Sequence, residues 1–232
     1  MITKILTTFK NFLSRFRKFI FKNYREHILS KILSREMERV EKIDKKKVVK
    51  ILDFGSGHNP VVIKEIIKNL SDKYKNTKFL AYCYDFYSQK EIKIMNKNSN
   101  IKFLNIKNLS NNNLIKFNFC LIVDVLHHIR LEKEKKIFNI VKKLKKKSKF
   151  LIIKDHFKYG FFSNLALIIM DFVGNYGDNV KIPKTYFSVS KFENFLSKLN
   201  FVELKRINNE KYYKWYWLFF NNKKLHFISI LK

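Results

Sequence analysis

Carboxylates, glycines and histidines recur where apolar runs of this sequence end. Asp53 ends the first run and is followed by Gly55 and Gly57, and Asp85 ends the second run. Two glycines after a strand let the chain turn sharply and let a ligand approach the backbone. An acid at the end of the next strand can accept hydrogen bonds from both hydroxyls of a ribose. The pattern predicts a site for a ligand that carries a ribose.

The same glycine turn lacks the other marks of a phosphate-binding loop. A dinucleotide fingerprint requires G-x-G-x-x-G, and Pro60 stands at the position of the third glycine. The sequence also has no Walker loop, G-x-x-x-x-G-K-[ST], at this position. Asn59 and Pro60 instead have the residue types that cap a helix and begin it. The turn therefore predicts a ribosyl ligand without phosphates, followed by a helix over 61–74.

Two later apolar runs end in acids and histidines. The run VDVLHHI supplies Asp124, His127 and His128, and the run KDHF supplies Asp155 and His156. Because imidazole titrates near neutrality, Asp155 and His156 form a candidate general base, with a purely positional role as the alternative. His128 either points into the ligand crevice or packs against the following helix. A metal site needs three converging ligands; this spacing does not demand one, and no metal is predicted.

The rest of the chain alternates between strand and helix patterns. Strands are predicted at 48–54, 78–86, 101–106, 117–126, 149–157, 201–207 and 225–231, and helices at 61–74, 89–97, 131–146 and 188–199. Such alternation predicts a parallel sheet with helices on both faces. The short link 221–224 predicts that the last strand runs against the others, and 212–220 is compatible with strand or helix. Ser190 is the predicted cap of the helix at 188–199.

Residues 1–47 are predicted to form a basic, helical N-terminal extension of a domain that covers 48–232. Over residues 2–20, Ile, Leu and Phe recur at helical spacing among Lys and Arg, and the first acid is Glu26. Such a helix can pack on the domain, act as a targeting presequence, or lie on an anionic membrane through residues 1–25. A second helix is predicted at 24–42.

The composition is strongly basic, with 49 Lys and Arg against 19 Asp and Glu and a formal charge of +30. This charge suggests an anionic partner, either nucleic acid or a membrane. Compositional drift is the alternative, because Lys is spread over nearly every segment. No apolar run reaches the roughly 18–20 residues of a membrane span. Cys83 and Cys120 lie inside apolar runs and are predicted to be buried thiols. A cytoplasmic protein is expected, with a peripheral membrane location as the alternative.

Taken in order, ILDFGSG (51–57), YCYDF (82–86), FNFCLIVDVLHHI (117–129) and KSKFLIIKDHF (147–157) resemble the class I S-adenosylmethionine (SAM)-dependent methyltransferases. The resemblance covers roughly 48–231, and LHFISILK at the end is similar to the last strand of that family. Each motif by itself is widespread, and the ordered set carries the resemblance. It implies a doubly wound, mostly parallel seven-stranded sheet with an antiparallel last strand, and SAM as the cofactor.

The resemblance also implies roles for single residues. Gly55 and Gly57 would pass beneath the cofactor, Asp53 would orient the loop and the methionine amino group, and Asp85 would hold the ribose hydroxyls. The implied cofactor-binding set is Asp53, Gly55, Ser56, Gly57, Asp85, Phe86 and Asp124.

Two positions depart from the family pattern. The third glycine of the family falls at Asn59, and the acid that often follows the third strand is missing from LNIKNLS (104–110). Asn105 or Asn108 would have to supply a carbonyl there. These departures leave the contacts to the adenine open.

Methyl transfer is an in-line displacement in which an enzyme mainly aligns the acceptor with the methyl group. The catalytic candidates are therefore the residues at strand ends, namely His156, Asp155 and His128. The segment 158–187 is inserted where the family builds its acceptor pocket, and it is apolar and aromatic apart from a few polar residues. A small, apolar or lipid-like acceptor methylated on oxygen is predicted, although a helix that only packs on the sheet is the alternative.

Two other functions compete with this prediction. The positive charge favours an RNA methyltransferase, although the sequence has no N/D-P-P-Y/F motif and Cys120 lies within a strand. Nucleic acid is therefore a disfavoured partner. The other alternative is a non-catalytic, membrane-associated or assembly protein built on a methyltransferase fold.

Overall fold

The computed structural model describes residues 24–57, 59–85, 88–97, 101–104, 115–129, 134–175, 182–208 and 223–232. The strands are β1 (Val48–Phe54), β2 (Lys78–Tyr84), β3 (Lys102–Leu104), β4 (Phe117–Val123), β5 (Ser148–His156), β6 (Glu203–Asn208) and β7 (His226–Leu231). The helices are α2 (Tyr24–Val40), α3 (Val61–Lys73), α4 (Gln89–Lys97), α6 (Leu126–Ile129), α7 (Glu134–Lys147), α8 (Phe161–Asn175) and α9 (Val189–Lys198), with 3₁₀ turns at Ile43–Lys45 and Lys223–Leu225.

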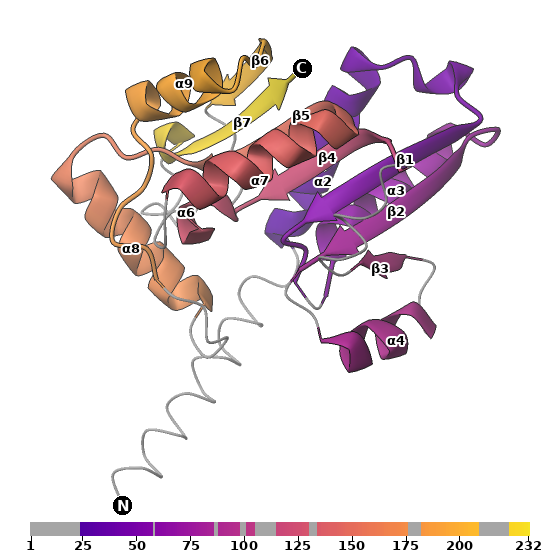
Figure 1. Cartoon of the computed structure of the whole chain (residues 1–232), viewed down its shortest axis with the longest axis horizontal. Coiled ribbons are helices and arrows are strands. Elements are labelled where there is room, and N and C mark those ends of the chain that lie inside the picture. The colour runs from indigo at the N-terminus through magenta and orange to yellow at the C-terminus, as the bar shows by residue number, and fades with distance from the viewer. Residues whose placement is uncertain are drawn as a thin grey trace, which may run out of the picture.

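The strands form one seven-stranded sheet in the order β3-β2-β1-β4-β5-β7-β6 (Figure 1). β7 pairs antiparallel with both β5 and β6, and the other pairs are parallel. The predicted doubly wound sheet with an antiparallel last strand is confirmed. Because the order reverses between β1 and β4, the carboxyl ends of these strands flank the crevice where such sheets bind ligands.

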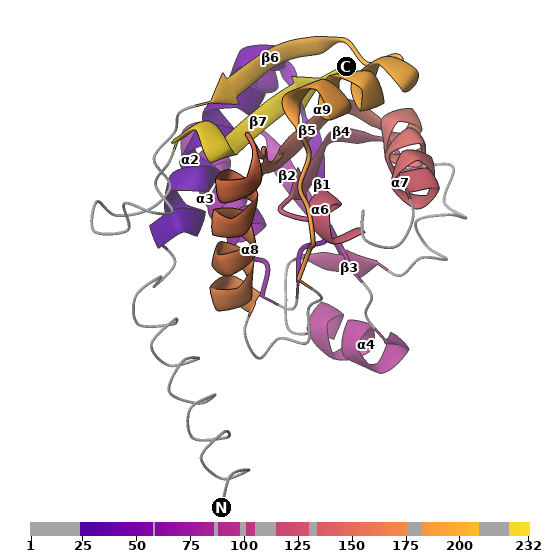
Figure 2. The ribbon, with the colours of Figure 1, turned by 90° about the vertical axis from the view of Figure 1, so that its left-hand side faces the viewer.

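Helices cover both faces of the sheet (Figure 2). On one face, side chains of α2 and α3 pack against alternate residues of the central strands, such as Ile51 and Leu121. On the other face, α7 and α9 pack against the intervening residues, such as Leu52 and Ile122. Burial on both faces explains why the strands read as continuous apolar runs rather than alternating ones.

Several predicted boundaries shift by a few residues. The strand predicted at 117–126 ends at Val123, because Asp124 adopts a left-handed φ of 53° and α6 begins at Leu126. Ser188, not Ser190, caps α9, and its side chain accepts a hydrogen bond from the Lys191 N–H. Pro60 is the cap of α3 and the helix begins at Val61. The predictions for 1–23, 105–114 and 209–222 lie outside the described residues.

α2 belongs to the main core. Leu29, Leu33 and Met37 are fully buried in the same cluster as the sheet. Glu36, also fully buried, accepts from Arg39 at 2.7 Å and from Lys205 of β6 at 2.9 Å. The helix is therefore fixed across the sheet by apolar packing and by a buried charge with cationic partners. The predicted division of the chain at residue 47 stays a prediction.

α8 occupies most of the described part of the segment 158–187. Its residue Leu167 is buried with Tyr186 and Leu225 in a small separate cluster. Tyr186 donates a hydrogen bond to the Leu167 carbonyl at 2.9 Å. Among the described residues, no helix, α8 included, has the length and apolar character needed to cross a membrane.

Candidate functional site

The chain turns at the end of β1 through two glycines with left-handed backbone. Gly55 has a φ of 83° and Gly57 a φ of 64°. The Gly55 N–H donates to the Tyr84 carbonyl of β2 at 2.7 Å and closes the turn against the sheet. A Cβ at Gly55 would collide with Val125 Cγ2, whereas a Cβ at Gly57 would meet no atom of the described residues within 4 Å. Gly55 is therefore required by packing, and Gly57 leaves open space beside the backbone.

Asp85 and Ser56 meet the same turn. Asp85 follows β2, and its Oδ2 accepts a hydrogen bond from the Gly57 N–H at 2.8 Å. The Ser56 N–H donates to the Tyr84 carbonyl at 3.3 Å. The structure thus brings together the glycine turn and the acid of the next strand, as the sequence predicted. Phe86 lies outside the described residues.

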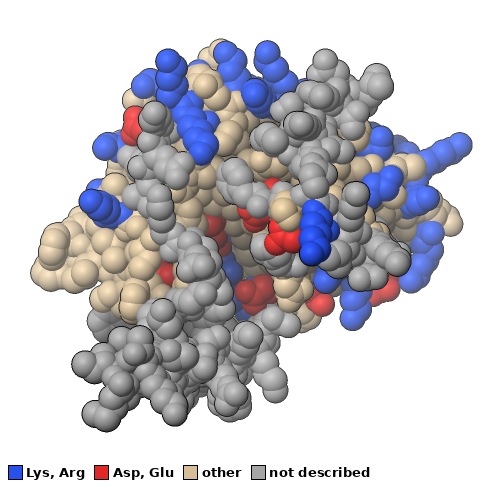
Figure 3. Space-filling view, turned by 60° about the horizontal axis from the view of Figure 1, so that its bottom comes forward, with Lys and Arg blue, Asp and Glu red and all other residues tan. Residues whose placement is uncertain are grey.

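Asp53 is buried at this turn, with 4% of its surface exposed. Burial disfavours its charged form, and the nearby charge of Asp85 acts in the same direction. Together they raise the pKa of Asp53 to about 7. Figure 3 shows Asp and Glu side chains near the middle of that view, with most of the visible Lys and Arg side chains around its margin.

Asp124 is surrounded by basic side chains. Its Oδ1 lies 2.5 Å from Lys154 Nζ and 3.1 Å from His156 Nε2. Its Oδ2 pairs with Arg25, near the start of α2. Arg25 and Lys154 are partners that sequence reasoning missed. The role of Asp124 in cofactor binding stays a prediction.

Asp155 pairs with His127, not with the imidazole of His156. Asp155 Oδ1 lies 2.6 Å from His127 Nδ1, and it also accepts from the backbone N–H of His156 at 2.7 Å. Neighbouring residues on a strand point to opposite faces. Lys154 and His156 therefore reach Asp124, while Asp155 reaches His127. Strand alternation is the signal that would have predicted different partners for the side chains of Asp155 and His156.

His127 joins two carboxylates in a buried network. Its Nε2 lies 3.3 Å from Asp171 Oδ2 of α8, and that same oxygen accepts from the Tyr186 hydroxyl at 2.6 Å. Burial opposes a charge on His127, but Asp155 and Asp171 outweigh it and raise the pKa of His127 to about 9. Despite burial, His127 holds the pKa of each of these acids below its usual range. At neutral pH this residue is an imidazolium and cannot serve as a base.

His156 has the opposite protonation state. It is 2% exposed, and its Nδ1 has no hydrogen-bond partner among the described residues. Burial, together with the charges of Lys154 and His127, holds the pKa of His156 well below its usual range. Its imidazole is therefore neutral at pH 7, and the same lowered pKa makes it a weak proton acceptor. His128 is half-buried, and its ring centroid lies 4.1 Å from that of His127.

In the described part of the chain, two trios of side chains at this edge have ligand atoms within 4.8 Å of one another. They are His127, His128 and Asp171, and His127, Asp155 and His156. A hydrogen bond to Asp155 and an ion pair with Asp171 account for the closeness of His127 to both acids. The short distances thus have an explanation that needs no metal.

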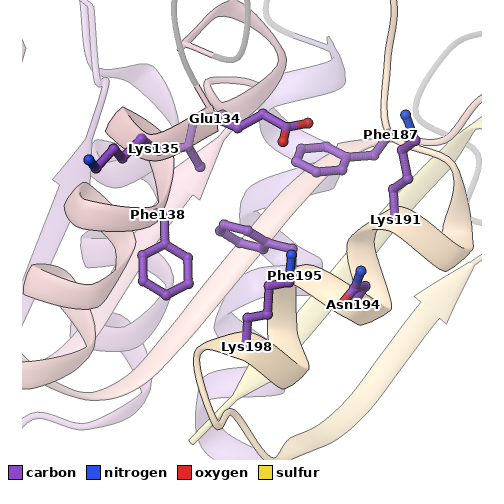
Figure 4. A pocket seen from close by; sticks show the side chains of 9 residues that line it. Glu134, Lys135, Phe138, Phe187, Lys191, Asn194, Phe195 and Lys198 are labelled. Atoms are coloured by element: carbon purple, nitrogen blue, oxygen red, sulfur yellow. The ribbon is translucent and has the colours of Figure 1, made fainter.

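A separate cleft of about 390 Å³ lies between α7 and α9 (Figure 4). Phe138, Phe187 and Phe195 form its apolar wall, and its margin carries Lys135 and Lys191 among other polar residues. The cleft includes none of the predicted site residues. It is therefore separate from the glycine turn.

No protein-family model and no curated protein matches this chain. The chain is similar to the solved structure of the plantazolicin methyltransferase BpumL with SAH and a triazolic desmethylPZN analog (TM-score 0.61, 15% identity, 95% of this chain and 89% of that chain). It is also similar to a SAM dependent methyltransferase from Archaeoglobus fulgidus (TM-score 0.52, 12% identity, 88% and 94%).

A third similar structure is LepI in complex with SAM (TM-score 0.54, 10% identity, 86% of this chain and 46% of that chain). The chain thus spans about half the length of LepI. Together with the sheet order and the turn after β1, these similarities show that the chain has the class I SAM-dependent methyltransferase fold. At identities this low, the structural similarity establishes only the fold. The reaction has to be inferred from the geometry of the site.

Proposed function

We propose that this protein is a SAM-dependent methyltransferase that acts on a small acceptor. The observation that carries the proposal is the Gly55–Gly57 turn with Asp85 against it, at the switch point of the sheet. Gly57 leaves space for a ligand, and Asp85 places a carboxylate beside that space. Structures of the same fold described in complex with SAM or SAH support this choice of cofactor.

The residues present fit the proposed cofactor. When bound, SAM supplies a methyl group activated by a sulfonium. Asp85 would accept hydrogen bonds from the ribose hydroxyls, and Asp53, once ionised, would hold the cationic amino group. Roles for Ser56, Phe86 and Asp124 in this site belong to the same proposal.

We assign the acceptor side of the site to the ends of β4 and β5. His156 is the best candidate for a general base, because it is neutral and lies beside the Asp124 cluster. Asp155 acts through His127 as a positioning residue, and His128 is a candidate contact to the acceptor. The apolar helix α8 at this edge supports an apolar or lipid-like acceptor methylated on oxygen. No metal takes part in this proposal.

Three alternative functions compete with this proposal. Methylation of RNA is favoured by the charge of +30. A reaction other than methyl transfer is favoured by one structure of similar fold, described as a pericyclic reaction enzyme (TM-score 0.51, 11% identity). The third alternative is a protein without catalytic activity.

We propose a cytoplasmic location, with peripheral membrane association through residues 1–25.

Calorimetry with SAM tests the cofactor. The wild type should bind SAM, and Asp85→Ala should weaken binding at least about tenfold, because charge-assisted hydrogen bonds are lost. Asp72→Ala on α3, an acid with an exposed side chain, is the matched control and should leave binding unchanged. Absence of SAM binding by the wild type would contradict the proposal.

Transfer of a labelled methyl group into whole-cell extract tests the acceptor. The extract is separated into lipid, RNA, protein and small-molecule fractions after the reaction. Label in the lipid or small-molecule fraction supports the proposed acceptor. Label in RNA, with RNA binding that falls steeply with salt, would favour the RNA alternative.

A further inference from the structure

α8 carries a stripe of exposed apolar side chains. Successive helical residues are about 100° apart, which places residues 161, 162, 165, 169 and 172 on one face about 100° wide. Among them Phe161 and Phe162 are 76% and 83% exposed. The full stripe, with its exposed fractions, is Phe161 76%, Phe162 83%, Leu165 43%, Ile169 47% and Phe172 46%. An exposed apolar stripe of this size marks a surface that meets another apolar phase.

The opposite face of α8 is fixed to the protein. Leu167 is fully buried, and Asp171 is bound by Tyr186 and His127. Asn164 donates to the Lys184 carbonyl at 3.2 Å. Turning the apolar stripe inward would break these contacts. The exposed position of Phe161 and Phe162 is therefore set by the fold, and the stripe is not a pocket wall facing the sheet.

The stripe lies at the edge of the sheet that carries the candidate site. α8 follows the carboxyl end of β5, and Figures 1 and 2 show it beside that end of the sheet. Arg25 pairs with Asp124 at the same edge. The preceding residues, 1–23, therefore join the described chain there, and their sequence is basic and aromatic without a single acid.

The charge of the chain favours an anionic partner over a second copy. With a formal charge of +30, two copies repel each other, whereas an anionic surface attracts the chain. Five side chains are also far fewer than the roughly 20–30 residues that each partner contributes to a stable interface. RNA would require cations within the stripe, and the only charged residue of α8, Asp171, faces inward. Lys158 and Lys184 flank the helix in the chain and in space.

We propose that the outer face of α8 inserts into the surface of an anionic membrane, with Phe161 and Phe162 at its point of deepest contact. Aromatic residues on an otherwise apolar face bind in the headgroup region, and nearby cations add attraction to anionic lipids. Docking in this orientation turns the carboxyl edge of the sheet toward the bilayer. The next step rests on the proposed function: a methyltransferase docked in this way takes an amphipathic acceptor from the membrane.

Flotation of the full-length chain with vesicles tests the docking. Vesicles of phosphatidylcholine with phosphatidylglycerol should bind the wild type, and vesicles of phosphatidylcholine alone should bind it more weakly. The double variant Phe161→Ser/Phe162→Ser should lose at least about tenfold in vesicle affinity, because two exposed aromatic side chains no longer enter the lipid. The control Val202→Ser/Leu204→Ser removes two other exposed apolar side chains near β6, which are 61% and 45% exposed. This control should bind vesicles as the wild type does.

A fluorescent label separates α8 from residues 1–23 as the contact. Cys83 and Cys120 are fully buried, so a polarity-sensitive label reacts selectively with Phe162→Cys. Emission from this label should shift to the blue and be quenched by brominated lipid on vesicle binding, and a label at Val202→Cys should stay in water. A chain that floats while the label at position 162 stays in water would overturn the proposal.

Three other results would also overturn it. They are no flotation of the wild type, equal flotation of the double variant, or self-association without vesicles that the double variant abolishes. SAM calorimetry on the same variants separates the two proposals. Unchanged SAM binding with lost vesicle binding supports the membrane docking. Vesicle binding without SAM binding would contradict the proposed methyl transfer but not the docking.

Discussion

At the scale of single residues, Gly55 and Gly57 are both left-handed but have different surroundings. Gly55→Ala should lower the free energy of unfolding by about 2–4 kcal/mol, because the methyl collides with Val125 and the backbone is strained. Gly57→Ala should cost about 1 kcal/mol of stability. Its methyl enters the proposed cofactor space, so SAM binding should weaken at least about tenfold. Urea unfolding and calorimetry on both variants measure the contrast, and similar effects on stability and binding would contradict it.

The buried carboxyl group of Asp53 predicts a pH dependence of cofactor binding. Its pKa of about 7 means that the group is half protonated near neutrality. The proposed contact to a cationic amino group needs the ionised form, so SAM affinity should rise as the pH increases from 6 to 8. Calorimetry across that range measures this rise, which Asp53→Asn should abolish. A wild-type affinity that is flat with pH would contradict the assignment.

At the scale of elements, His127 connects β5 to α8 through Asp155 and Asp171. Its pKa is raised from 6.5 to about 9 in the folded chain. The stabilisation of the folded chain by protonated His127 is fully present below pH 6.5 and is lost as the pH rises through 9. We expect the free energy of unfolding to fall by roughly 1–3 kcal/mol over this window.

The variant His127→Gln should remove this alkaline loss, and His128→Gln is the matched control that should keep it. Hydrogen exchange of α8 amides gives a local measure of the same equilibrium, because undocking of the helix exposes them. Protection of α8 that does not change between pH 7 and 10 would show that His127 does not fix the helix.

At the scale of the whole molecule, ligand binding should stabilise the chain by mass action. SAM at about 100 times its Kd adds about 2.7 kcal/mol to the free energy of unfolding. For a domain of this size, that raises the Tm by roughly 5–10 °C. Differential scanning fluorimetry should show this rise for the wild type and the Asp72→Ala control. Asp85→Ala should show little of it, and an equal rise in Asp85→Ala would remove that residue from the proposed site.

The sequence by itself determined the order and type of most elements. Buried strands such as 48–54 were predictable because burial on both faces gives continuous apolar runs. The glycine turn and Asp85 were also predictable, since a turn between a strand and a helix depends on neighbouring residues. The residues that cap helices were predicted less accurately, since Ser188 rather than Ser190 caps α9. Caps depend on backbone angles that two nearby serines do not distinguish.

Only the tertiary structure decided which side chains meet. The sequence paired Asp155 with the imidazole of His156, but in the structure Asp155 bonds His127 and His156 contacts Asp124. Arg25 reaches Asp124 across about a hundred residues of chain, which no local pattern encodes. The orientation of α8 could likewise not be predicted, because an apolar helix has the same sequence pattern whether its apolar stripe faces a pocket or the solvent. Asp171 fixes that choice, because the free energy of its buried hydrogen bonds depends on partners far away in the sequence.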